Sequence, residues 1–179
     1  MASVRFPRWR RRDPDHTPPE AVLRALDGSA GRDRLLVAAR SGSTWLLATT
    51  HRFGAIDADG TIRWLRPWHE VDAASWGKES ATLTVTFVDG GRPVTLPLTD
   101  AHTFLQTLRE RVQASVVTSA DVPLEGARRA RAVIRQDLAT GDLIEQLVLG
   151  RGTRASDAID AAAAVAFAAL RDDAGMPPR

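Results

Sequence analysis

The chain has 179 residues, of which 24 are basic, 22 are acidic and none is cysteine. A chain of this length buries roughly 70% of its surface on folding, so it can form a hydrophobic core without disulfide bonds. The lack of cysteine excludes disulfides, thiolate zinc sites and cysteine nucleophiles. The formal net charge of +2 gives no general signature of nucleic-acid binding.

Residues 1–16 are expected to form a basic mobile arm, because their prolines and charges follow no period. Residues 1–12 contain five arginines and no acid, interleaved with Phe6 and Trp9. Such an arm suits contact with an anionic membrane surface, or with nucleic acid through phosphates and base stacking. An arm without any partner is the alternative. Its candidate binding residues are Arg5, Arg8, Trp9, Arg10, Arg11 and Arg12.

A cytoplasmic location is predicted, with the arm as a means of peripheral membrane contact. The longest apolar run, residues 161–170, is half of the roughly 20 residues that a transmembrane helix needs. No apolar segment of the kind found in secretory signals follows the N-terminal arginines.

Residues 17–118 are expected to form one domain that starts with a short helix. Thr17, Pro18 and Glu20 suit a helix start with a capping box, and Gly28 suits its end. Short apolar runs broken by turn residues then predict seven antiparallel strands, as in a barrel or sandwich. Their expected ranges are residues 34–40, 44–50, 53–57, 61–67, 72–76, 82–88 and 92–98.

A second helix is predicted to begin after Asp100, which would cap it, and to lie across the strands. Its apolar residues trace one stripe with a period of 3.6. They fall at positions 101, 104, 105, 108, 112 and 116.

The segment from Trp45 to Ile56 places Thr49 and Arg52 around a turn between two apolar runs, and Trp68-His69-Glu70-Val71 follows one strand later. These motifs resemble bacterial PH-like and GRAM-like domains of the pleckstrin-homology superfold, among them actinobacterial proteins of about this length. The resemblance covers residues 34–117. It implies an α+β fold, a seven-stranded antiparallel PH-like barrel capped by a C-terminal helix. The uncharged loop of residues 41–43 does not support phosphoinositide binding there.

Residues 119–126 are expected to be a linker, and residues 127–175 an added β-hairpin plus helix (ββα) unit. Strands at 127–136 and 142–150 flank a hairpin turn, and Ser156 caps a helix that reaches about Arg171. This helix is apolar almost all round. The unit is therefore expected to pack on the barrel or to form a homodimer with a second chain.

Three of the five tryptophans lie in residues 63–76, together with His69 and Glu70. We interpret Trp68 and Trp76 as core and corner residues of a barrel, and Trp64 and Arg66 as candidates for a contact surface. Adjacent residues of an extended segment point to opposite faces, so His69 and Glu70 could act on one group only across a turn.

The leading hypothesis is a non-enzymatic PH-like interaction or adaptor module with an unknown protein partner and no cofactor or metal. The first alternative is a nucleic-acid-binding protein that uses the arm. The second is an enzyme whose site brings together His51, His69 or His102 with acids. Such a site would have to form from scattered residues, because no catalytic motif is present in the sequence.

Overall fold

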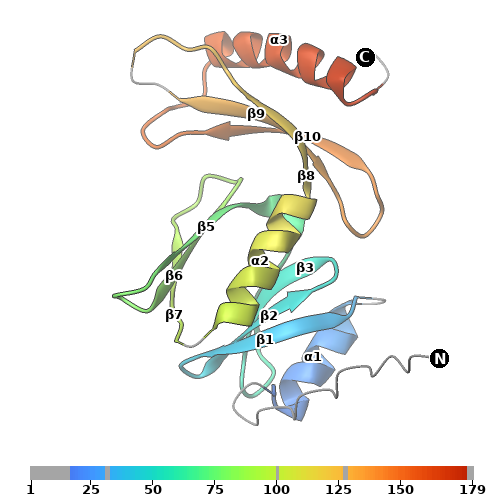
Figure 1. Cartoon of the computed structure of the whole chain (residues 1–179), viewed down its shortest axis with the longest axis vertical. Helices are drawn as coiled ribbons and strands as arrows, with labels where there is room; N and C mark the ends of the chain where they lie inside the picture. Colours follow the sequence, from blue (N-terminus) through green and yellow to red (C-terminus); the bar gives the residue numbers. More distant parts are fainter. Residues whose placement is uncertain (1–16, 31–32, 100, 127–128, 177–179) are drawn as a thin grey trace, which may run out of the picture.

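The computed structural model describes residues 17–30, 33–99, 101–126 and 129–176 (Figure 1). It is an α+β protein in which ten strands form three antiparallel sheets. The first sheet has the order β1-β2-β3-β4, with strands Leu35–Ser41, Thr44–Thr49, Arg52–Asp57 and Ile62–Pro67. The second has the order β5-β6-β7, with strands Val71–Gly77, Thr82–Phe87 and Val94–Pro97. The third has the order β10-β9-β8, with strands Leu143–Leu149, Ala130–Gln136 and Val116–Asp121.

Three α-helices cover these sheets: α1 (Glu20–Ala30), α2 (His102–Ala114) and α3 (Asp157–Asp173). In Figure 1, α2 lies between the first and second sheets, α1 lies at the far side of the first sheet, and α3 lies across the third sheet. Two units result. We call residues 17–115 the body and residues 116–176 the extension.

The core of the body lies between the first two sheets, and α2 closes it with Phe104 and Leu108. Trp68 is completely buried and stacks on Phe53 with 5.6 Å between ring centroids. Its indole Nε1 donates to the carbonyl of Thr49 at 3.0 Å, so its one polar atom is satisfied. The interpretation of Trp68 as a core residue is confirmed.

The outer face of the first sheet is covered by α1. Val22 and Leu26 of this helix are buried against Trp45, Leu47 and Ile56. With core on one face and α1 on the other, all six residues of β2 are buried. This explains its apolar sequence, because a strand covered on both faces has no polar side.

The seven predicted strands of the body are confirmed, with ends that shift by at most two residues. The prediction of a closed PH-like barrel is not confirmed: among the described residues the seven strands form separate sheets of four and three, and no closed barrel is present. The first helix was predicted to end at Gly28, but it continues to Ala30.

The extension has three strands where two were predicted. The apolar stripe of the second helix indicated that it continued to Val116, with a linker from residue 119. Instead the helix ends at Ala114, and the N–H of Ser115 donates to the carbonyls of its last turn. Val116 and Val117 then begin β8, which pairs with β9. β-branched residues favour strands, and here this preference prevails over the 3.6-residue period.

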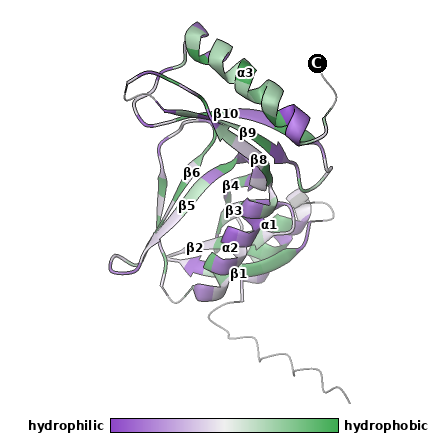
Figure 2. Ribbon diagram, turned by 45° about the horizontal axis from the view of Figure 1, so that its top comes forward, coloured by the Kyte–Doolittle hydropathy of each residue, from purple (hydrophilic) through white to green (hydrophobic). Residues whose placement is uncertain are grey.

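The helix of the extension begins as predicted, because the Ser156 side chain accepts from the N–H of Ile159. Ile159, Ala163 and Leu170 are buried against β8 and β9. Figure 2 shows α3 as a largely hydrophobic helix, and Val165 on its outer face is 73% exposed. Pairing with a second chain through this unit stays a prediction.

Candidate functional site

The arm residues Arg5, Arg8, Trp9, Arg10, Arg11 and Arg12 lie outside the described residues. Asp100, the predicted helix cap, also lies outside them. In the part of the chain that the structure describes, no helix has the length and apolar character needed to cross a membrane.

Trp64 and Arg66 both make contacts within the body. Trp64 is half-buried, edge-on to Phe53 at 4.9 Å and to Phe87 at 5.5 Å between ring centroids. The Arg66 guanidinium lies 4.4 Å from the centre of the Phe87 ring, and its Nη1 donates to Asp89 at 2.7 Å. Both side chains therefore already have partners within the body.

His69 and Glu70 lie on a 3₁₀ turn, Trp68–Glu70, rather than on an extended strand. Both side chains line one cavity, so the turn removes the separation that strand alternation would impose. The three histidines proposed for an enzyme do not share partners: His51 Nδ1 lies 3.6 Å from Asp33, whereas His69 Nδ1 lies 3.9 Å from Asp137, and His102 is exposed. No group of three or more metal-ligating side chains is found within the described ranges.

Thr49 and Arg52, the residues that carried the family resemblance, bind a common partner. The buried carboxylate of Asp33 accepts four hydrogen bonds, from the Thr49 and Thr50 hydroxyls, the His51 N–H and the Arg52 Nε. Burial would raise the pKa of Asp33, but the four donors outweigh it and hold that pKa below its usual value. This motif therefore ties the β2–β3 turn to the segment before β1.

The strongest candidate for a binding site is a groove of about 400 Å³ between β5 and α2, which we call the β5–α2 groove. Leu105, Leu108 and Val112 of α2 form one side, and Trp76 lies on the β5 side. Trp76 is 38% exposed, so it is a groove residue and not the core or corner residue that we predicted. Its indole Nε1 donates to the carbonyl of Leu98 at 3.1 Å, which fixes the ring beside the groove.

Among the described residues, Arg109 is the single charged side chain that lines the β5–α2 groove, and it is exposed on α2. Ala74, Ser75, Leu83 and Gln113 complete the lining. The groove thus combines an apolar surface with one cation at its rim.

β5 lies at the edge of the second sheet, and residues 73–77 are all exposed. An edge strand presents unpaired backbone N–H and C=O groups, and proteins commonly protect such edges with lysine, proline or other charges. Residues 73–77 contain none of these. By contrast, the edge strand β7 includes Pro97, and the edge strand β4 includes Arg63, Arg66 and Pro67. Residues 73–77 at the edge of β5 therefore lack the charges and prolines that β4 and β7 carry, and a register irregularity between Val71 and Ala73 precedes them.

Comparison with known proteins found no matching protein family, curated protein or solved structure. The candidate site therefore rests on its own geometry. The sequence analysis missed the β5–α2 groove because Trp76 and Arg109 lie on different elements and are 33 positions apart in the chain. The lack of charge and proline in residues 73–77 was the one feature that could have indicated it.

Proposed function

We propose that the chain is a non-enzymatic interaction module, built on a PH-like fold, that binds an extended peptide segment of a partner protein in the β5–α2 groove. The observation that carries the proposal is the unprotected edge of β5 beside an apolar groove. A bound peptide would add a strand to β5 through backbone hydrogen bonds, and its alternate side chains would enter the groove.

The PH-like assignment is supported by the order of elements, in which sheets of four and three strands precede a helix that closes the core. It is also supported by the Thr49 and Arg52 positions, which the resemblance singled out. The β1–β2 turn carries no charge at residues 41–43, so the proposal does not involve a phosphoinositide at that turn.

The chemistry of the groove defines the expected peptide. Five residues of β5 span about 17 Å at the usual rise of a strand, so a peptide segment of about five residues would fill the edge. Apolar side chains at alternate positions would contact Trp76, Leu105 and Val112. An acidic residue of the peptide would approach Arg109, so the groove should favour peptides with negative charge.

Selection from a phage-displayed library of random peptides on the full chain tests this function. We expect selected peptides to alternate apolar residues and to carry Asp or Glu. Ser75→Glu places a charged side chain on the β5 edge that also repels acidic peptides, and it should weaken their binding about tenfold, equal to about 1.4 kcal/mol.

Two charge variants complete the test. Arg109→Glu should weaken the same peptides, and the loss should diminish as salt is added, because the charge lies at the rim. Arg92→Glu, at an exposed position outside the groove, is the matched control and should leave binding unchanged. Selected peptides that bind Ser75→Glu and Arg109→Glu as tightly as the native chain would refute the proposal.

A further inference from the structure

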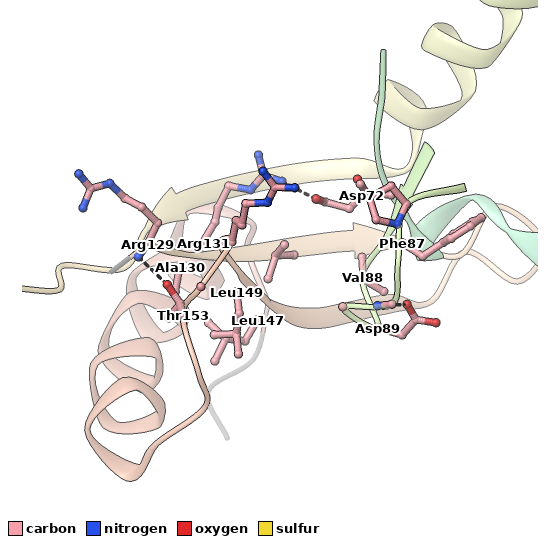
Figure 3. Close-up of a pocket in the computed structure, with 18 of the residues that line it drawn as sticks. Asp72, Phe87, Val88, Asp89, Arg129, Ala130, Arg131, Leu147, Leu149 and Thr153 are labelled. Atoms are coloured by element: carbon pink, nitrogen blue, oxygen red, sulfur yellow. Dashed lines mark hydrogen bonds and ion pairs between the residues drawn. The ribbon is translucent and has the colours of Figure 1, made fainter. Parts of the chain in front are cut away.

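A second groove lies between the body and the extension. It consists of two adjoining cavities, of about 780 and 580 Å³, which share Val88 and Asp89. One wall is formed by Asp72 of β5 and the β6–β7 turn, and the other by β9, β10 and the loop of residues 150–153 (Figure 3). We call it the interunit groove.

Arg131 and Asp72 on the wall of the larger cavity form one charge cluster with the buried Arg135, in which positive charge exceeds negative. The Asp72 carboxylate accepts from Arg131 Nη2 at 2.7 Å and also lies 3.8 Å from Arg135 Nη2. Arg135 is 1% exposed, so its charge is removed from water. Two guanidinium groups thus share one carboxylate, and a charge buried with incomplete compensation is costly.

Arg131 has hydrogen-bonding capacity that Asp72 does not use. Its side chain is 43% exposed, and Nη2 is the nitrogen that binds Asp72. Its Nε is buried without a hydrogen-bond partner among the described residues. In Figure 3 the Arg131 side chain extends from β9 toward Asp72, on the wall of the larger cavity.

The rim of the larger cavity adds charges of both signs. Arg129 and Arg151 are exposed there, and so is Asp121. Asp89 is neutralised by Arg66 at 2.7 Å. The charged residues that line the larger cavity are thus three arginines and three aspartates, and the excess positive charge comes from the buried Arg135 beside Asp72.

The smaller cavity is lined by two residues whose buried polar atoms make no hydrogen bond among the described residues; His69 Nδ1 lies 3.9 Å from the Asp137 carboxylate, too far for one. His69 Nδ1 and Gln146 Oε1 are buried, and neither has a hydrogen bond within the described part of the chain. Buried polar atoms are nearly always hydrogen-bonded in native proteins, so both atoms point to a polar group that binds between them.

We propose that the interunit groove binds an elongated organic anion. Its carboxylate or phosphate group is held by Arg131 in the larger cavity, and a small rotation of that side chain brings Nε to it. Its middle passes Val88, and a polar group at its other end meets His69 and Gln146. This site is separate from the β5–α2 groove and does not depend on peptide binding there.

Calorimetric titration of the full chain with N-acetyl-dialanine and with inorganic phosphate tests the proposal. N-acetyl-dialanine offers a carboxylate at one end and amides toward the other. Arg131→Gln should weaken the binding of either probe about tenfold or more, because a hydrogen bond to a charged group is lost. Arg154→Gln, an exposed arginine outside the groove, is the control and should have no effect.

Gln146→Leu separates the two ends of the site and does not touch Asp72. It should weaken binding of N-acetyl-dialanine severalfold and leave binding of inorganic phosphate unchanged, because phosphate is too short to reach the smaller cavity. Binding of phosphate alone, with the same dependence on Arg131, would support the anion site and assign it to phosphate. The proposal is overturned if neither probe binds at millimolar concentration, or if Arg131→Gln binds both probes as the native chain does.

Discussion

The first and second sheets of the body contribute to the same core but differ in what covers them. Every residue of β2 is buried, because α1 packs on the outer face of the first sheet. In β5, residues 73–77 are all exposed, and the strand lies at a free edge. One half of the body is thus sealed, with β2 covered on both faces, whereas the other half leaves residues 73–77 of β5 exposed.

The two sheets also differ in sequence. β2 reads TWLLAT, with large apolar side chains toward both faces, whereas residues 73–77 of β5 read AASWG. Small and weakly polar residues leave an edge accessible, and Trp76 supplies one large contact surface. Changes in the sealed half should therefore reduce stability, and changes at β5 should reduce binding.

The largest expected effect is that of Trp68→Ala in the sealed core. The substitution removes the stack on Phe53 and the hydrogen bond to the Thr49 carbonyl. The free energy of unfolding should fall by about 4 kcal/mol, measured by urea denaturation. A loss below about 1 kcal/mol would show that Trp68 is not a core residue.

The next largest effect is expected for Asp33→Asn. An amide of the same size replaces a buried carboxylate that accepts four hydrogen bonds, so the free energy of unfolding at neutral pH should fall by about 2 kcal/mol. Urea denaturation of the native chain and the variant gives this difference directly.

This contribution should depend on pH in a defined direction. The pKa of Asp33 is lower in the folded state than its usual value, so folding is stabilised when the carboxylate is ionised. The stabilisation is complete above the ordinary aspartate pKa of about 4 and is lost as the pH falls through the lower folded value. The variant should lack this part of the acid destabilisation. Asp27→Asn, at an exposed position of α1, should retain it, and equal acid sensitivity in all three proteins would contradict the account.

The smallest effect on stability is expected for Trp76→Ala. The partly exposed side chain loses the apolar area that it buries and one hydrogen bond, to the Leu98 carbonyl, so the free energy of unfolding should fall by about 1.5 kcal/mol. Peptides selected on the native chain should nevertheless bind the variant at least about tenfold more weakly, because aromatic anchors dominate such interfaces. A comparison of Trp68→Ala with Trp76→Ala thus distinguishes an effect on stability from an effect on peptide binding.

The strands of the body could be predicted because their cause is local. In β6, Leu83, Val85 and Phe87 alternate with threonines, and this alternation gives both the strand and its buried face. β8 could not be predicted, because Val116 continues the stripe of the preceding helix and no glycine or proline marks the change.

The partners of charged residues could not be predicted from the sequence. Thr49 and Arg52 were recognised as a motif, but Asp33, which binds both, lies sixteen residues before Thr49. Arg135 looked like an ordinary strand residue, and its burial arises only when the extension docks beside Asp72. Such contacts follow from tertiary packing, which no local pattern encodes.

Amide hydrogen exchange of the full chain, with and without a selected peptide, tests the central claim most directly. Exchange reports the protection of individual backbone N–H groups. The account predicts that amides of residues 73–77 exchange more slowly in the complex, and that those of β7 are unchanged. Protection confined to other segments, with residues 73–77 exchanging as fast as in the free chain, would contradict it.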